Sequence, residues 1–265
     1  MQRQRIPMTI EAFERLPRKL GWKFEYYNGE AVLSPGSLAV VAKVAVELRS
    51  MHTPFPLRRP TLDDEGPLID AYEEAFRDTV AYCDWPASAI EQSAREAIET
   101  YFGGGRGKAH RASRLVALDA GPDEAVVLGA ALVREGQTRA LLDLLFVRPP
   151  WQRKGLATAL VGAVLNQLFD EGVERLRSQY LLANAGSRAW HRSFGFVDEP
   201  DLWVARAYYR HAQHTLWRAR QVGGVGEGEC VRLEKEAARW EREVERLERL
   251  AAEQGLDAVL PWRGL

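Results

Sequence analysis

The sequence predicts an α/β fold, with a mixed, mostly antiparallel sheet that is flanked by helices. Segments with apolar residues at helical spacing alternate along the chain with short apolar segments typical of strands. Glycine and proline clusters separate these segments, as expected of turns. Hydrophobic residues make up 46% of the 265 residues. The chain can therefore bury a hydrophobic core, and its length fits one large domain or one medium domain with additions.

Residues 1–52 predict a small cap made of a short helix and a hairpin. Thr9 is a suitable N-cap, and Phe13 lies on the apolar face of the helix that follows. Asn28-Gly29 stands between two strand-like segments and is the strongest two-residue hairpin signal. The valine-rich segment 38–46 fits a further strand, although its alanines also permit a helix.

This opening resembles the start of a restriction-endonuclease-like family, in which a short helix also leads into an Asp/Asn-Gly-Glu hairpin. Here the matching residues are Asn28-Gly29-Glu30. The acidic and lysine residues that would complete a nuclease site do not follow in the expected pattern. We therefore interpret residues 1–52 as a structural cap.

Residues 53–221 predict the main domain, which begins with a short strand at 56–60. Leu68, Ile69, Tyr72 and Phe76 then have helical spacing, which predicts a helix over 62–77. A second helix over 87–102 ends at the glycine-rich segment 103–107. Strands are predicted at 114–119, 125–134 and 138–147, with turn residues Gly121-Pro122-Asp123 after the first of them.

The rest of the main domain follows Pro149-Pro150, which ends the third of these strands. Leu160, Val164 and Leu168 lie on one face of a helix predicted over 155–171. The remaining elements are a strand at 175–182, a short helix at 187–193, and two last strands around Phe196 and 215–218.

Residues 222–265 begin with a glycine-rich segment that predicts a linker, and a helix is expected over 230–254. Its apolar residues repeat at alternate spacings of four and three, as in a heptad seam. Two interpretations remain open, namely packing of the seam on this chain's own surface and formation of a homodimer. The seam consists of Leu233, Ala237, Trp240, Val244, Leu247 and Ala251.

Composition excludes several classes of function. The formal net charge of −1 gives no basic field that would attract nucleic acid or a membrane surface. Cys83 and Cys230 are too few for a disulfide framework, and no histidine spacing is typical of a metal site. Neither a signal peptide nor a membrane span is indicated. We expect a cytoplasmic protein without a metal.

The segment after the strand at 138–147 carries the strongest functional signal. Gln152-Arg153-Lys154-Gly155-Leu156-Ala157 opens a helix, and the first N–H groups of a helix have no intrahelical acceptor. They also lie at the positive end of the helix dipole, where anions bind. Small Gly155 and Ala157 let a phosphate approach the main chain, and Arg153 and Lys154 add positive charge. A pyrophosphate is the expected ligand.

Gln152-x-x-Gly155-x-Ala157 resembles the acyl-CoA motif of the GNAT N-acetyltransferase family. The segment from Asn184 to Phe196 is similar to that family's second signature, and Leu57 to Asp64 is similar to its opening. The resemblance implies a GNAT-type fold that binds acetyl-CoA in a gap beside the strand ending at Val147. The residues implied in cofactor binding are Phe146, Val147, Gln152, Arg153, Lys154, Gly155, Leu156, Ala157, Thr158, Asn184 and Ser187.

The family's direct transfer of an acetyl group to an amine requires a base, an oxyanion donor and a proton source for the thiolate. The backbone N–H of Val147 is the candidate oxyanion donor. His191 occupies the position where the family usually has a tyrosine that acts as general acid. His191 is therefore the candidate general acid, and the alternative is a histidine that only lines the CoA channel. Tyr208 and Tyr209 are alternative donors.

Asp143 is the candidate base, because it interrupts an apolar strand on the face that alternation assigns to Leu145 and Val147. A salt-bridged or surface-facing aspartate is the alternative, and a chain of waters could serve as base instead.

The sequence thus predicts an N-acetyltransferase that acts on a primary amine, with a non-catalytic acyl-CoA-binding regulator as the alternative. The acceptor pocket is expected from residues 62–105 and 198–212, and nothing in them selects an acceptor.

Overall fold

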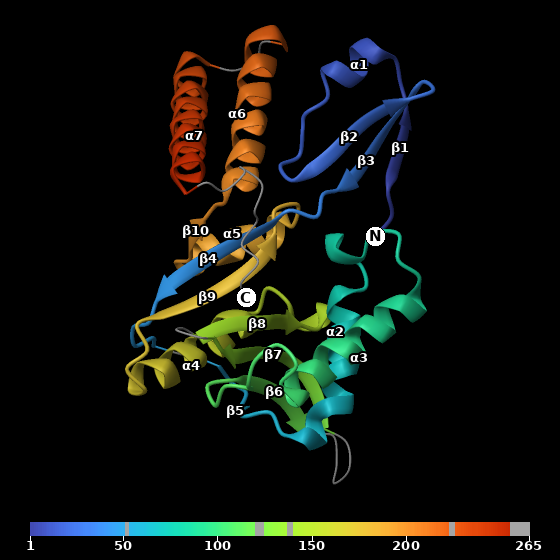
Figure 1. The fold of residues 1–265 in the computed structure, drawn as a ribbon. Helices are drawn as coiled ribbons and strands as arrows, with labels where there is room; N and C mark the ends of the chain where they lie inside the picture. The colour runs from blue at the N-terminus through green and yellow to red at the C-terminus, as the bar shows by residue number, and fades with distance from the viewer. Residues whose placement is uncertain (51–52, 120–124, 137–139, 223–225, 255–265) are drawn as a thin grey trace. The chain divides into compact units, whose positions relative to one another are not determined.

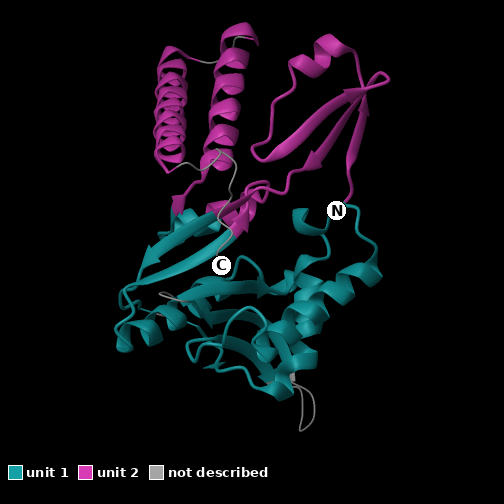
Figure 2. Cartoon of the chain, in the orientation of Figure 1, with its two compact units in different colours: residues 1, 41–179, 190–197 teal, residues 2–40, 180–189, 198–265 magenta. Residues whose placement is uncertain are grey.

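The computed structural model describes residues 1–50, 53–119, 125–136, 140–222 and 226–254. Its strands form two sheets: one of three strands in the order β1-β3-β2, and one of seven in the order β10-β4-β9-β8-β7-β6-β5 (Figure 1). Two compact units can be distinguished (Figure 2). Unit 1 contains residues 1, 41–179 and 190–197, and unit 2 contains residues 2–40, 180–189 and 198–265.

Unit 1 contains most of the large sheet and confirms the predicted mixed α/β class. Its strands pair antiparallel from β5 to β8, and β8 pairs parallel with β9. The strands are β4 (Ala39–Ala45), β5 (Leu57–Arg58), β6 (Arg114–Asp119), β7 (Ala125–Glu135), β8 (Ala140–Val147) and β9 (Arg175–Leu181). The helices are α2 (Glu65–Phe76), α3 (Ala87–Gly103) and α4 (Leu156–Asp170), with short 3-10 turns η1 (Leu62–Asp64), η2 (Val80–Tyr82) and η3 (Pro149–Trp151).

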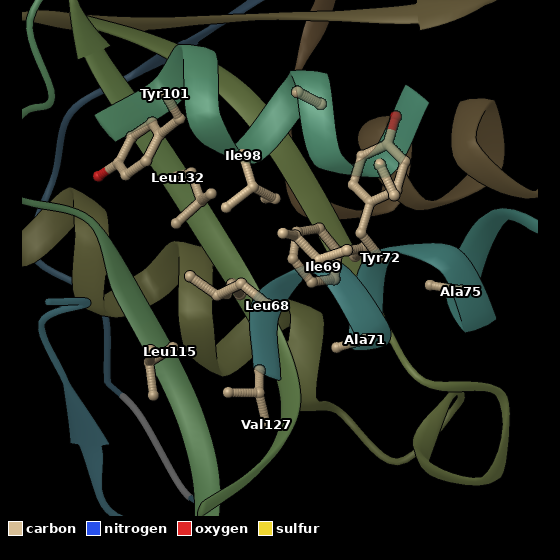
Figure 3. Close-up of a cluster of buried hydrophobic side chains, with 14 of the residues drawn as sticks. Leu68, Ile69, Ala71, Tyr72, Ala75, Ile98, Tyr101, Leu115, Val127 and Leu132 are labelled. Carbon is tan, nitrogen blue, oxygen red and sulfur yellow. The ribbon is translucent and has the colours of Figure 1, made fainter. Parts of the chain in front are cut away.

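Helices α2 and α3 pack on one face of β6, β7 and β8 and bury the main core there (Figure 3). Leu68 and Ile69 of α2 meet Ile98 of α3, all of them buried. Helix α3 ends at Gly104, whose φ of 73° is the left-handed conformation that glycine adopts most readily. The apolar spacing in the sequence therefore identified the core face of α2 correctly.

The motif Leu57 to Asp64 is explained by a local ion pair. The buried Asp64 carboxylate accepts from Arg58 Nη1 and Nη2 at 2.7 and 2.5 Å, and from the Thr61 backbone N–H at 2.8 Å. Burial alone would raise the pKa of Asp64, but the Arg58 and Thr61 hydrogen bonds outweigh it and lower the pKa below its usual value. The pair fixes the approach of the chain to α2.

We expect Asp64→Asn to lower the free energy of unfolding by about 1–3 kcal/mol at neutral pH, because the amide cannot replace a charged acceptor. A carboxyl whose folded-state pKa is lowered stabilises the fold above its unfolded pKa, and that stability is lost as pH falls through the folded pKa. Urea unfolding from pH 7 to pH 2 should therefore show the two proteins converging in acid. A constant difference across that range would contradict this role of the charge.

Unit 2 begins with the predicted helix and hairpin. They form α1 (Ile10–Glu14), β2 (Trp22–Tyr27) and β3 (Glu30–Pro35), with Thr9 as the N-cap. Asn28 and Gly29 both have positive φ, 49° and 79°, as a tight hairpin turn requires. An additional edge strand, β1 (Gln4–Pro7), was not predicted and pairs with β3. The segment predicted as a cap thus supplies β1–β3, whereas β4 joins the large sheet.

The prediction of a last strand at 215–218 was wrong. After α5 (Ala185–Phe194) and β10 (Val197–Glu199), the chain forms helix α6 (Leu202–Val222). Its buried residues are spaced by three and four, and the Asp201 carboxylate caps its start by accepting the Val204 N–H at 2.8 Å. This tertiary burial outweighs the weak strand preference of residues 215–218.

Helix α7 (Glu227–Glu253) packs along α6 in unit 2. Trp240 lies on Tyr208 with ring centroids 4.1 Å apart and planes 3° from parallel. Leu233, Trp240 and Val244 of the predicted seam are buried. The seam therefore packs on this chain's own surface, which is the first of the two interpretations.

Some predicted features lie outside the described residues, namely the turn at 121–123, residues 223–225 of the glycine-rich linker and the helix end at Gly255. The prediction that 227–229 belong to the linker was wrong, because α7 begins at Glu227. Within the described ranges, no helix is both long and apolar enough to cross a bilayer. The same residues contain no group of three or more His, Cys, Asp or Glu arranged to hold a metal.

Candidate acyl-CoA site

Strand β8 presents one edge to β7 and the other to β9. Its register with β9 joins Ala140–Leu142 to Leu176–Ser178. Just after its end, the Arg148 N–H donates to Leu128 O of β7 at 2.8 Å. Neighbouring residues along a strand present their N–H groups to opposite edges, so the Val147 N–H and C=O face away from β7. The Val147 N–H can therefore pair with a ligand, whereas the Val147 C=O accepts from Gln152 Nε2.

A bulge at Asp143 changes the face that its side chain occupies. Leu132 pairs with Leu144 and Val133 pairs with Leu142, which leaves Asp143 as the extra residue. Its carboxylate forms a very short hydrogen bond with the Arg134 guanidinium. Arg134 shares a face of β7 with Leu132, which belongs to the α2/α3 core. The prediction that Asp143 shares the face of Val147 was therefore wrong, because strict alternation fails at a bulge.

The Arg134–Asp143 pair is largely buried, with side-chain exposures of 1% and 11%. Among the described residues, Arg134 Nε and Nη1 have no hydrogen-bond partner. The salt-bridged alternative for Asp143 is therefore what the structure shows. Arg134 was missed in the sequence, although an arginine that continues the apolar strand Val126–Val133 is a recognisable signal.

The turn between β8 and α4 is held by hydrogen bonds to the end of the sheet. Arg148 donates from Nε to Val127 O at 2.7 Å and from Nη1 to the Glu74 carboxylate at 2.6 Å. Gln152 donates from Nε2 to Val147 O at 2.9 Å. These bonds fix the route of the chain from Val147 into the helix, and they explain why the motif contains glutamine.

Two residues of this turn adopt left-handed backbone conformations, Arg153 with φ of 63° and Gly155 with φ of 82°. A Cβ at Gly155 would meet nothing within 4 Å, so this glycine is required by its conformation and not by crowding. Gly155 is the N-cap of α4, and the Ala159 N–H bonds back to its carbonyl at 2.9 Å. The amides before Ala159 point out of the helix end.

The turn is exposed while the helix behind it is anchored in the core. Residues 152–155 and Thr158 are exposed, Ala157 is half-buried and Leu156 is buried. The Lys154 ammonium lies over the Trp151 ring at 4.8 Å. Cationic side chains and free amide donors thus share one accessible surface, as a bound phosphate group requires.

His191 lies in unit 1 and is buried, with 3% of its surface exposed. Its Nε2 shares a hydrogen bond of 3.0 Å with Ser178 Oγ, and its ring packs edge-on against Phe196. Ser178 is the last β9 residue in register with β8. We did not predict Ser178 from the sequence, although its position between Leu176 and Tyr180 marks a buried polar group that needs a partner.

Asn184 and Ser187 lie in unit 2, at the start of α5. Asn184 Oδ1 accepts the Ser187 N–H at 3.0 Å, so Asn184 caps the helix. Its own N–H donates to Leu181 O at 2.8 Å. With Oδ1 used by the cap, the Nδ2 group is the part of the side chain that remains to donate to a ligand.

Tyr208 and Tyr209 lie inside α6, and not between two strands as predicted. Tyr208 is buried and donates to Asp198 Oδ2 at 3.2 Å, while Tyr180 donates to Oδ1 at 2.6 Å. Burial, together with the Asp198 hydrogen bond, raises the pKa of Tyr180. Tyr209 donates to Glu241 of α7 at 2.8 Å, and this bond raises the pKa of Tyr209.

Comparison with known proteins agrees with this geometry. Residues 69–196, just under half of the chain, match the model of the acetyltransferase (GNAT) family. That segment contains β6 to β9, the turn into α4 and all of α5. Residues 69–196 are therefore similar to the GNAT acetyltransferase family. No curated protein sequence matches the chain.

Several solved structures are similar at low identity. A GCN5-related N-acetyltransferase from Sphaerobacter thermophilus is 20% identical with a TM-score of 0.41, and the match covers 61% of this chain and 48% of that one. This chain therefore matches about half the length of that protein. PaiA N-acetyltransferase from Thermoplasma acidophilum, in complex with coenzyme A, is 16% identical with a TM-score of 0.45, covering 55% and 91%. At these values neither structure identifies a substrate.

Proposed function

We propose that this protein is an N-acetyltransferase that moves an acetyl group from acetyl-CoA to a primary amine. The observation that carries the proposal is the exposed turn 152–155, in which left-handed Arg153 and Gly155 lead into the amide-rich start of α4. A pyrophosphate carries charge and acceptor oxygens that such a helix end binds well. Arg153 and Lys154 add attraction that weakens as salt is raised.

The Val147 N–H, which faces away from β7, supports pairing with the pantetheine arm. The predicted pairing with the backbone of Phe146 was wrong, because alternation turns the Phe146 N–H and C=O toward Ala130 of β7. Thr158 lies beside Trp190, whose indole N–H points to its hydroxyl at 3.4 Å. In unit 2, Asn184 Nδ2 is the donor expected to contact a pantetheine carbonyl, and Ser187 follows on the first turn of α5.

The reaction requires that the amine nitrogen form a bond to the thioester carbon, that the carbon–sulfur bond break, and that the thiolate gain a proton. The Val147 N–H faces away from β7 and is the proposed donor to the oxyanion. His191 is the proposed proton donor to sulfur. Tyr208 and Tyr209 remain alternative donors, although each hydroxyl already donates to a carboxylate.

Asp143 and a chain of waters are the candidates for the base that takes the amine proton. The hydrogen bond from Arg134 occupies Asp143 Oδ2, so a proton would have to reach the other carboxylate oxygen. This favours a water-mediated route, with Asp143 as the last acceptor.

The proposal is tested by incubating the protein with acetyl-CoA and a panel of amines, and by following free thiol and acetylated product. Acetylation of any panel member would establish the enzyme and begin to define its acceptor. Binding of acetyl-CoA without transfer to any amine would favour the alternative, a non-catalytic acyl-CoA-binding regulator. Absence of acetyl-CoA binding would overturn both.

His191 can be tested with a pair of variants. His191→Phe removes the proton donor and the Ser178 bond, whereas His191→Gln keeps a polar group for Ser178 but cannot titrate. We expect kcat to fall about 100-fold in both if His191 is the acid. Both variants should also lose any limb of the pH–rate profile that His191 contributes as an acid. An unchanged kcat and pH profile in the glutamine variant would remove His191 from the chemistry.

A further inference from the structure

The turn between β9 and α5 is joined to the N-terminal hairpin inside unit 2. Trp22, the first residue of β2, donates its indole N–H to Ala183 O at 3.3 Å. The Leu182 N–H donates to Leu38 O at 2.8 Å. Both bonds reach the residues directly before Asn184, so the hairpin contacts the segment that supports the proposed pantetheine ligand.

Gly21 makes the closest approach in this contact. Its φ is 78°, and a Cβ at this position would lie 2.4 Å from the Ala183 nitrogen and 2.5 Å from the Leu182 carbonyl carbon. Real Cβ atoms do not approach main-chain atoms so closely, so only glycine fits here. Gly36 follows the same hairpin and donates its N–H to Gly21 O at 2.8 Å. The backbone at Gly21 therefore contacts the backbone of residues 182–183 directly, without side chains between them.

The conformation of this turn sets the place of Asn184. The Asn184 N–H bonds to Leu181 O, and its carbonyl accepts the Arg188 N–H at 3.0 Å. Arg188 in turn donates from Nη1 to Leu182 O at 2.9 Å. With Oδ1 fixed by the Ser187 N–H, rotation of the side chain is restricted and the direction of Nδ2 follows from the backbone. A shift at Ala183 would move Nδ2 with it.

We infer that Gly21 and Trp22 of the N-terminal hairpin are positioning residues that set the direction of the Asn184 side chain. The inference rests on the proposed function, because it takes Asn184 as a pantetheine ligand. It assigns a role to a segment that lies outside residues 69–196.

The test compares two ligands on three proteins by calorimetry. Trp22→Phe removes the indole donor, and we expect acetyl-CoA to bind roughly 2- to 10-fold more weakly. Gly21→Ala forces the turn to move and should cost on the order of 10-fold or more. Adenosine 3′,5′-bisphosphate, which lacks the pantetheine arm, should bind equally to all three proteins.

Phe24→Leu is the matched control. Phe24 lies two residues after Trp22 on the same side of β2 and packs on the small core of Phe13, Ala31 and Leu33. The substitution should lower the stability of the hairpin without weakening acetyl-CoA binding. If Phe24→Leu and Trp22→Phe weaken binding equally, or if neither Trp22→Phe nor Gly21→Ala weakens it, the positioning role is overturned.

A measurement without ligand separates this inference from the proposed function. The chain has only three asparagines, Asn28, Asn166 and Asn184, so ¹⁵N-asparagine labelling gives three side-chain amide signals. We expect Trp22→Phe to move the Asn184 signal and leave the Asn166 signal in place, whereas Phe24→Leu should move neither. Displacement of Asn184 without any acetyl-CoA binding by the wild type would overturn the proposed function alone. An unmoved Asn184 signal would overturn the positioning role.

Discussion

Gly155→Glu is expected to abolish acetyl-CoA binding while the protein stays folded. The glutamate places a negative charge at the start of α4, where we propose that the pyrophosphate binds the exposed amides. Juxtaposed like charges cost several kcal/mol, so we expect affinity to fall on the order of 100-fold or more. Isothermal titration calorimetry measures the loss, and circular dichroism with thermal melting checks the fold.

Two controls separate charge from backbone strain at this position. Any non-glycine residue at φ of 82° costs roughly 1–2 kcal/mol of stability. Gly155→Asn tolerates that conformation best and should keep most of the affinity, and Gly155→Gln matches the size of glutamate without its charge. Equal losses in the glutamine and glutamate variants would show that bulk or strain, and not charge, is responsible. Undiminished binding by Gly155→Glu would remove the pyrophosphate from this turn.

Asp143→Asn is expected to lower the free energy of unfolding by about 3–5 kcal/mol, because it leaves the Arg134 guanidinium buried without a counter-charge. Arg134 is 1% exposed, and its Nε and Nη1 already lack partners among the described residues. Urea unfolding at neutral pH measures the change.

The double variant Arg134→Met with Asp143→Leu is the matched control, because apolar residues of similar size often replace a buried ion pair without loss. It should recover most of the stability lost by Asp143→Asn. Activity per folded molecule then tests the chemistry, since a stable double variant that still acetylates amines cannot rely on Asp143 as its base. A fully stable Asp143→Asn protein would contradict the structural role of the pair.

The sequence alone determined most elements of the main domain and the place of the turn before α4. Apolar spacing over Leu68 to Phe76 and alternation in the strands are local patterns, so they located α2 and the strands β6 to β9. The helix start at Gln152 to Ala157 could also be predicted from the sequence, because a helix start is defined by a few consecutive residues. The Gln152 side chain and the Gly155 backbone, which hold this turn, lie within the motif itself.

Only the tertiary structure decided the features that depend on partners far along the chain. Residues 215–218 belong to helix α6, which packs against α7 along the face that includes Tyr208. The residue types at 215–218 give no indication of that contact. Asp143 changed face because one extra residue in β8 shifts its register against β7. Trp22 and Ala183 lie far apart in the sequence, so their hydrogen bond arises only from folding. Local sequence fixes local conformation, whereas bulges, covered faces and long-range contacts are selected by packing of the whole chain.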